Sequence, residues 1–171
     1  MAIIFRDLTK DEIEVRVQSV TEKGVVLLLY KDARVDMNIL DEAVGNTHWQ
    51  RDHFECKGNL YCRVGINVAK EGEPAEWVWK ADCGAESNTE AEKGEASDSF
   101  KRACFNWGIG RELYTSPFIW IKAEDANINN KKCYDKFSVE KIQITNKRIT
   151  GLAIRNDTLK KRVFVYCENN G

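Results

Sequence analysis

The sequence predicts an α+β fold in which a helix packs across an antiparallel β-meander, giving a β-β-β-α core. Between residues 48 and 85, three segments alternate apolar and polar side chains, as the strands of a half-buried sheet do. Short turns join these segments, so neighbouring strands run in opposite directions. From Ala96 onward the apolar side chains recur every three or four residues, which is the period of a helix. A meander that leads directly into a helix predicts this core.

A β-hairpin and a helix are expected before the core. Residues 12–20 alternate apolar and polar side chains, and residues 25–30 form an apolar run of strand length. Glu22-Lys23-Gly24 fits the turn between them. Residues 31–44 then show a helical period and end at Gly45, a common helix terminator. The apolar positions that predict this helix are Ala33, Met37, Leu40 and Val44.

The three core strands are expected at residues 48–56, 60–68 and 77–85. Lys57-Gly58-Asn59 fits a hairpin turn between the first two strands. Glu71-Gly72-Glu73-Pro74 turns the chain again before the third strand.

The central helix is expected from Ala96 to the glycines Gly108 and Gly110, which fit a helix C-terminus. Residues 86–95 are polar and fit either a loop or earlier turns of the same helix, because Gly94 lowers the helix propensity there. The apolar stripe of this helix consists of Ala96, Phe100, Ala103, Cys104 and Trp107.

A small C-terminal β-meander is expected after the helix. Residues 118–121 fit a short strand, and residues 126–132 fit a linker because they are rich in Asn and Lys. Three further strands are expected at residues 137–145, 149–156 and 162–167.

Length and composition predict a single domain over residues 1–171, with its core at about 25–120 and a C-terminal β extension at about 133–167. Hydrophobic residues make up 43% and charged residues 31% of the chain, an ordinary balance for a globular protein. No apolar run approaches the ~18–20 residues of a membrane span, and the N-terminus does not have the pattern of a signal peptide. We therefore expect a cytoplasmic location.

The net charge of −1 conceals an asymmetry along the chain. Residues 1–95 contain 12 Lys and Arg against 19 Asp and Glu, whereas residues 96–171 contain 14 against 8. Such segregation permits a basic surface for nucleic acid. It also permits head-to-tail contacts between the acidic and basic sides of neighbouring subunits. If folding mixes the two parts, neither surface survives.

The sequence lacks the usual patterns of metal and nucleotide sites. The six cysteines include no C-x-x-C pair, and the cluster of His48, His53, Cys56 and Cys62 does not have the spacing of a zinc site. No Gly-x-x-x-x-Gly-Lys-Ser/Thr loop is present, so an ATP-driven recombinase of the usual kind is not expected. We expect free thiols, no bound metal, no cofactor and no enzymatic activity.

The side of the central helix away from its apolar stripe carries two cations and an aromatic ring. With Phe100 as the origin, Lys101 lies at about 100°, Phe105 at about 140° and Arg102 at about 200° around the helix axis. A solvated charged face with Phe105 packed on a neighbouring element explains this pattern. An edge that contacts phosphates, with an aromatic ring beside it, explains it as well and is typical of single-strand binding.

The run EKGEASDSFKRACFNWGIGRELY around this helix resembles the Rad52 superfamily of single-strand annealing proteins, and especially its phage Sak-type members. Those proteins carry a similar order of motifs: Gly-Glu-Ala, an Asp, Lys-Arg-Ala, Trp-Gly-Ile-Gly-Arg and Leu-Tyr. The resemblance extends to residues 30–45 and 86–91 and covers roughly residues 25–120. It implies ATP-independent annealing of complementary DNA strands in recombination and repair. It also implies a homo-oligomeric ring, phage or prophage origin, and a host single-strand-binding protein as a candidate partner.

The resemblance also indicates DNA-binding residues. Lys101 and Arg102 are expected to hold phosphates along a groove between the helix and the sheet, and Arg34 matches an Arg of the family's DNA-binding surface. Phe105 stands where eukaryotic members tend to have another basic residue, so stacking or apolar contact is expected there. Independently of the resemblance, the alternation of the strands puts Arg63 and Lys80 with Tyr61 on an outward row of the sheet, where they would form the opposite wall of the groove or a solvated face.

Two other functions fit the residues. A metal-dependent nuclease would need acidic ligands, but Asp41/Glu42 and Glu90/Glu92 occupy nearby helical positions that do not converge on one ion. An oligomerisation module would instead pair Lys101 and Arg102 with acidic residues across a subunit interface.

Overall fold

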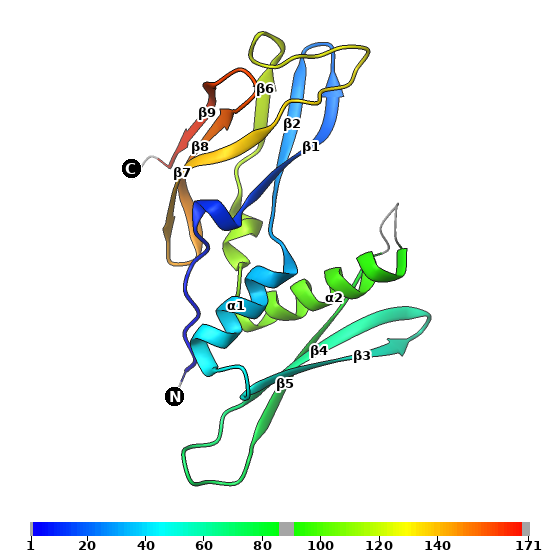
Figure 1. Ribbon diagram of the computed structural model, residues 1–171, viewed down its shortest axis with the longest axis vertical. Coiled ribbons are helices and arrows are strands. Elements are labelled where there is room, and N and C mark those ends of the chain that lie inside the picture. Colours follow the sequence, from blue (N-terminus) through cyan, green and yellow to red (C-terminus); the bar gives the residue numbers. More distant parts are fainter. Residues whose placement is uncertain (1, 86–90, 169–171) are drawn as a thin grey trace. The chain divides into compact units, whose positions relative to one another are not determined.

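The computed structural model describes residues 2–85 and 91–168 (Figure 1). The chain forms two compact units, each built from two separate stretches of sequence. Met1–Arg6 and Ala33–Gly110 form one, which we call the helix–sheet unit. Asp7–Asp32 and Arg111–Gly171 form the other, the six-stranded unit. No helix of the described residues is long and apolar enough to cross a membrane.

The helix–sheet unit confirms the predicted β-β-β-α core. Its antiparallel sheet has the order β3-β4-β5, and the long helix α2 packs against β4 and β5 (Figure 1). A second helix, α1, precedes the sheet and contacts α2. The elements are α1 (Ala33–Val44), β3 (Trp49–Cys56), β4 (Asn59–Asn67), β5 (Trp77–Cys83) and α2 (Ala91–Trp107).

The apolar stripe of α2 forms the core of this unit, as predicted. Phe100, Ala103 and Cys104 are fully buried. The ring of Trp49 stacks on Phe100 with the ring centres 6.1 Å apart. The indole N–H of Trp107 donates to the backbone oxygen of Val64 at 2.9 Å, which fixes the C-terminal end of the helix against β4.

Helix α2 begins earlier than the part predicted from residue 96. Residues 91–95 are helical. The sequence predicts either a loop or earlier turns of the helix for residues 86–95, and the helix is confirmed for residues 91–95. Residues 86–90 lie outside the described part of the chain, as does most of the family-like segment 86–91. Gly84 allows the close packing of β5 and α2, because a Cβ there would lie 2.2 Å from the backbone oxygen of Glu95.

Helix α1 differs in detail from its prediction. It begins at Ala33, two residues later than expected, and its fully buried residues are Asp36, Ile39 and Leu40. Met37 and Val44 are only half-buried. The buried stripe is therefore rotated relative to the predicted one, because two other elements and not the helical period alone determine which side is covered.

The six-stranded unit joins the predicted N-terminal hairpin and C-terminal meander in one antiparallel sheet with the order β6-β2-β1-β7-β8-β9. The link between the two parts is short, since only Glu14 and Ser138 are paired across β1 and β7. The strands are β1 (Glu14–Thr21), β2 (Gly24–Tyr30), β6 (Ile119–Lys122), β7 (Phe137–Thr145), β8 (Arg148–Asn156) and β9 (Lys161–Cys167). Short 3₁₀ helices are η1 (Lys10–Glu12), η2 (Arg111–Thr115) and η3 (Ala123–Asp125).

This sheet curls until its two edge strands, β6 and β9, contact each other. At the start of β9, the ammonium group of Lys161 lies 2.6 Å from a carboxylate oxygen of Asp125 in η3. The Asn156 amide donates to the backbone oxygen of Asp125 at 3.1 Å. The buried core residues of this unit include Val25, Leu27, Ile119, Ile121, Phe137, Val139, Ile149, Leu152 and Ile154.

The segment expected to be a linker is instead tied to the six-stranded unit. The Asp135 carboxylate accepts hydrogen bonds from the backbone and amide of Asn127 at 2.8 and 2.9 Å and from the Asn156 amide at 2.7 Å. Burial alone would raise the pKa of Asp135, but these hydrogen bonds outweigh it and lower the pKa below its ordinary value of 3.8. The connection from β6 to β7 is therefore held in a defined conformation.

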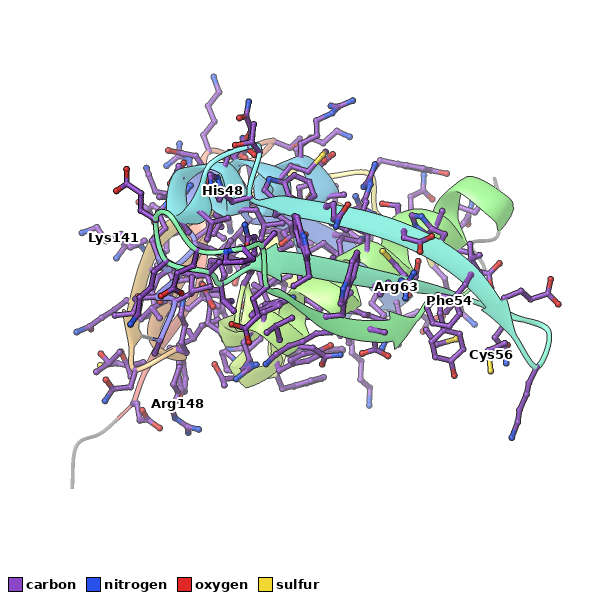
Figure 2. All side chains as sticks on the ribbon, turned by 90° about the horizontal axis from the view of Figure 1, so that it is seen from below. His48, Phe54, Cys56, Arg63, Lys141 and Arg148 are labelled. Atoms are coloured by element: carbon purple, nitrogen blue, oxygen red, sulfur yellow. The ribbon has the colours of Figure 1, made fainter. Side chains whose placement is uncertain are left out.

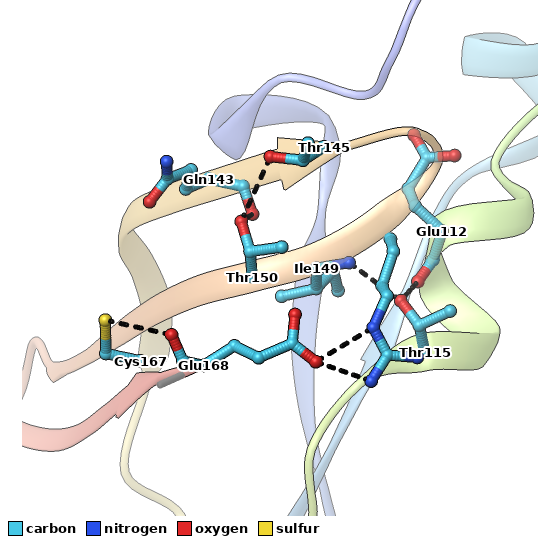
Figure 3. A network of polar contacts seen from close by, with 9 residues as sticks. Glu112, Thr115, Gln143, Thr145, Ile149, Thr150, Cys167 and Glu168 are labelled. Atoms are coloured by element: carbon cyan, nitrogen blue, oxygen red, sulfur yellow. Dashed lines mark hydrogen bonds and ion pairs between the residues drawn. The ribbon is translucent and has the colours of Figure 1, made fainter. Parts of the chain in front are cut away.

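A polar network connects η2 to β8 and β9 (Figure 3). The Thr115 hydroxyl donates to the backbone oxygen of Glu112 at 2.6 Å and accepts from the backbone N–H of Ile149 at 2.8 Å. Beside it, Arg148 pairs with Glu168 at 2.7 Å, and this hydrogen bond lowers the pKa of the Glu168 carboxyl. The network anchors the segment that leaves α2 to the six-stranded sheet.

Candidate nucleic-acid interface

The cations of α2 lie outside its buried stripe, as the helical spacing predicts. Lys101 and Arg102 are both half-buried, whereas their neighbours Phe100 and Ala103 are fully buried. Among the described residues, the Lys101 side chain makes no ion pair or hydrogen bond. Phe105, one turn further on, is also half-buried. The helix therefore presents two cations and an aromatic ring at the margin of its packed face.

Asp98 offsets part of the positive charge at this edge of α2. Its carboxylate accepts from the Arg102 guanidinium at 2.9 Å, one helical turn away, and from the backbone N–H of Ala85 at 3.0 Å. The Arg102 side chain remains 42% exposed, so a phosphate can reach it from solvent. A phosphate would nevertheless compete with Asp98 for the guanidinium.

Lys80 does not lie where the sequence predicted. In the register of the sheet Lys80 is opposite Val64, which is buried beneath α2, so Lys80 belongs to the helix-facing side. Its ammonium group donates to the backbone oxygen of Asn106 at 3.1 Å and lies 4.9 Å from the ring centre of Trp107. The predicted outward row of Tyr61, Arg63 and Lys80 is therefore wrong for Lys80. A long Lys side chain can cover an apolar ring and still reach the edge of the sheet with its charged end.

Arg63 does lie on the outward face of the sheet (Figure 2). Its guanidinium lies 4.7 Å from the ring centre of Trp79 and pairs with Asp52 at 2.6 Å. The indole ring of Trp79 in turn packs directly on Gly65 of β4. A Cβ at this position would lie only 2.8 Å from the ring, so the close contact needs a glycine. The arginine is thus fixed on an aromatic ring and its charge is already compensated.

Sequence reasoning missed the aromatic character of this outward face. Phe54 and Tyr61 stack across β3 and β4 with ring centres 5.4 Å apart, and Trp77 and Trp79 lie 6.1 Å apart on β5. Phe54 is 39% and Trp79 37% exposed. The signal that could have located this face is Gly65, since a glycine within a strand indicates a close approach of another group.

Arg34 lies exposed in the first turn of α1, within the same unit as α2. The structure therefore keeps Arg34, Arg63, Lys80, Lys101 and Arg102 in one unit but distributes them over two helices and both faces of a sheet. Their role in DNA binding remains a prediction.

The residues considered for metal binding do not converge. His53 faces α2, where its Nε2 lies 3.2 Å from the backbone oxygen of Ala96. Cys62 is buried on the same face, and burial raises the pKa of its thiol to about 11. Cys56 is exposed at the end of β3. Within residues 2–85 and 91–168, no three His, Cys, Asp or Glu residues form a group that could hold a metal ion.

The acidic pairs considered for a nuclease have other partners or lie outside the description. Asp41 accepts from the indole N–H of Trp49 at 2.6 Å, and Glu42 pairs with Arg6 at 2.6 Å. The side chains of Glu90 and Glu92 lie outside the described part of the structure.

The fold redistributes the charge asymmetry of the sequence. By sequence, the helix–sheet unit contains ten Lys and Arg against fourteen Asp and Glu. The six-stranded unit contains sixteen against thirteen. The cations of α2 thus belong to a unit with an acidic total, so any contact with phosphate there depends on their local positions.

A comparison with known families identifies the family of this chain. A model of the Rad52/22 family of double-strand break repair proteins matches residues 1–132. The chain belongs to the Rad52/22 family. The matched span contains all of the helix–sheet unit and the six-stranded unit through β6, and it ends before β7. A search of curated proteins found no match.

Membership of the Rad52/22 family assigns the chain to DNA strand annealing in recombination and double-strand break repair. Proteins of this family bind DNA and form oligomeric rings. The resemblance seen around α2 is thereby confirmed at the level of the superfamily.

Proposed function

We propose that this Rad52/22 protein anneals complementary single strands of DNA without ATP, as a ring of identical subunits. The observation that carries the proposal is the position of Lys101 and Arg102 beside the buried stripe of α2, in a chain whose family anneals DNA. Phosphate contacts carry no sequence information, so a strand held by its backbone leaves its bases available for pairing. The reaction needs no covalent chemistry, metal or cofactor.

The aromatic outward face of the sheet supports a second kind of contact. Phe54, Tyr61 and Trp79 present rings beside the Arg63 guanidinium, and bases stack on such surfaces without regard to sequence. Because Arg63 already pairs with Asp52, it would contribute stacking more than charge. Phe105 and Arg34 would add contacts at α2 and α1, and Lys80 would act at the margin of α2.

The finer assignments rest on the motifs around α2. The order Gly-Glu-Ala, Lys-Arg-Ala and Trp-Gly-Ile-Gly-Arg is similar to phage Sak-type annealing proteins, so we propose a phage or prophage origin and a host cytoplasmic location. A host single-strand-binding protein would be the partner that delivers coated DNA. We further propose that residues 1–171 act as one annealing domain, with residues 133–167 extending its core.

Annealing assays test the reaction itself. Two complementary oligonucleotides, one labelled with a donor and one with an acceptor dye, should pair faster in the presence of the protein with EDTA and without nucleotide. A requirement for ATP would contradict the proposal. Cleavage of a labelled strand after addition of magnesium would favour the nuclease instead.

A double variant tests the α2 edge. Lys101→Ala/Arg102→Ala should weaken binding equally for different base sequences and flatten the dependence of log K on log salt by about 1.4 per subunit in contact, at ~0.7 per single-strand phosphate. The matched control is Lys70→Ala/Lys141→Ala, which removes two exposed lysines. A smaller particle mass for the α2 variant alone would indicate an oligomerisation module, and a wild-type salt slope would remove α2 from the DNA site.

A further inference from the structure

One end of the six-stranded unit contains an open pocket of about 660 Å³. It lies where the turn between β1 and β2 meets the end of β6 and the connection that follows. We call it the Trp120 pocket. Its lining residues are Val20, Thr21, Glu22, Lys23, Trp120 and Lys131.

Gly24 determines the position of the aromatic wall. A Cβ at Gly24 would lie 2.5 and 2.8 Å from two atoms of the Trp120 indole, so only glycine lets this ring lie against β2. Trp120 is half-buried and borders the pocket, whereas its strand neighbours Ile119 and Ile121 are buried in the core. The chain thus places a large ring on the outside of the sheet and holds it there.

A tight turn determines the position of one cation. Asn130 and Lys131 have φ angles of 48° and 57°, and backbone hydrogen bonds between Asn129 and Lys132 at 2.9 and 3.0 Å close a two-residue turn around them. Two positive φ angles are the usual geometry of such a turn, as at Asn146 and Lys147 between β7 and β8. Asp135 anchors the same connection from its other end. The backbone of Lys131 is therefore held in a defined conformation beside the pocket.

The charges around the ring suit a nucleotide. Lys23 and Lys131 are exposed, and among the described residues their ammonium groups make no ion pair or hydrogen bond. Glu22 adds an acceptor for the N–H groups of a base but weakens the site for a free anion. The pocket belongs to the unit with the basic total of sixteen Lys and Arg against thirteen Asp and Glu.

We propose that the Trp120 pocket binds one nucleotide of a single DNA strand, with the base against the indole and the phosphate held by Lys23 and Lys131. This extends the proposed function by a second contact on a different unit, and it rests on that function only in taking the ligand to be DNA. A ring that stacks on a base and two cations that reach its phosphate are the groups that single-strand sites combine.

Photocrosslinking tests the site directly. An oligonucleotide containing 5-iododeoxyuridine should crosslink to the peptide that contains Trp120, as identified by mass spectrometry. Trp120→Leu, which keeps an apolar side chain against Gly24, should abolish that crosslink and weaken binding about 5- to 150-fold, the range measured for loss of one stacked base. Inorganic phosphate at millimolar concentration should not compete.

The lysines provide a second measurement that does not disturb the ring. Lys23→Gln/Lys131→Asn should reduce the slope of log K against log salt by about 0.7 per subunit in contact, because the two lysines hold one phosphate, and asparagine tolerates the backbone angle at residue 131. Lys136→Gln/Lys141→Gln, which changes two exposed lysines of the same unit, is the control. The proposal is overturned if the lysine variant keeps the wild-type salt slope and the wild-type protein forms no crosslink at Trp120. Neither measurement uses Trp120→Leu, so the test holds even if that variant does not fold.

The same experiments in a Lys101→Ala/Arg102→Ala background separate this inference from the proposed function. A Trp120 crosslink that persists there shows that the pocket binds DNA independently of α2. If the α2 variant binds DNA as tightly as the wild type and still forms the Trp120 crosslink, DNA binds at the pocket and α2 is not part of the DNA site. Competition by phosphate alone would identify a general anion site and overturn the nucleotide assignment.

Discussion

Replacing Asp98 by asparagine should strengthen DNA binding. The Asp98 carboxylate holds the Arg102 guanidinium at 2.9 Å, so a phosphate that binds Arg102 must displace it. Asparagine removes the charge and keeps an oxygen that can accept from the backbone N–H of Ala85, which Asp98 now satisfies at 3.0 Å. The change therefore removes the charge of this one competitor for Arg102 without removing the contact that joins β5 to α2.

The size of the gain follows from the exposure of the pair. The Arg102 and Asp98 side chains are 42% and 30% exposed, so solvent screens their attraction strongly. Exposed pairs one helical turn apart are worth about 0.3–1 kcal/mol, and Coulomb's law in water gives about 1 kcal/mol at 4 Å. Release of this interaction should tighten binding about two- to fivefold for each contacting subunit at low salt.

Fluorescence anisotropy with a labelled oligonucleotide measures this gain. Glu71→Gln changes the net charge by the same amount at an exposed loop of the same unit and is the control. In an Arg102→Ala background, Asp98→Asn should have no effect beyond that of Glu71→Gln. Equal gains for Asp98→Asn and Glu71→Gln, or no gain at all, would show that Arg102 does not bind phosphate.

Other predictions concern stability and composition. Gly65→Ala should destabilise the fold by about 1–3 kcal/mol, because the new Cβ would lie 2.8 Å from the Trp79 ring; an unchanged midpoint of urea unfolding would contradict this. Asp135→Asn should cost about 1.5–3 kcal/mol at pH 7, since it weakens charged hydrogen bonds from Asn127 and Asn156. Because the folded pKa of Asp135 is lowered, this stabilisation is complete above its ordinary value of 3.8 and is lost as the pH falls through the lower folded value. Unfolding curves of the two proteins should therefore converge in acid, and a constant difference would refute the assignment. Elemental analysis should find no stoichiometric zinc; about one zinc per chain would contradict this and make His48, His53, Cys56 and Cys62 the candidate ligands.

Local sequence patterns predicted most of the strand boundaries. The predicted and observed strands agree within one or two residues, because alternation and turn residues act over short distances. The same alternation separates the two faces of β5 but does not indicate which face α2 covers. The prediction puts Lys80 on the outward row with Tyr61 and Arg63, yet its stem covers Trp107 while Trp79 faces outward over Gly65. That choice depends on packing between elements that are distant in sequence.

Long-range pairing and buried polar groups could not be predicted. Nothing near Glu14 indicates that β1 will pair with β7, more than one hundred residues later. The connection after β6 has the composition of a linker, but Asp135 anchors it through Asn127 and Asn156. The pocket beside Trp120 arises from the meeting of three segments and has no local signature beyond Gly24.

The interleaving of the two units has a consequence for how the chain folds during synthesis. The helix–sheet unit is complete once residue 110 has emerged, whereas residues 7–32, which carry the hairpin of β1 and β2, belong to the six-stranded unit. The apolar strand β2 gains its second neighbour only when β6 is made, since Gly24–Leu27 pair with Ile119–Lys122. Until then the edge of β2 stays unpaired, and an unpaired apolar edge favours association with other chains. Strand β6 thus protects a strand that is synthesised more than eighty residues before it.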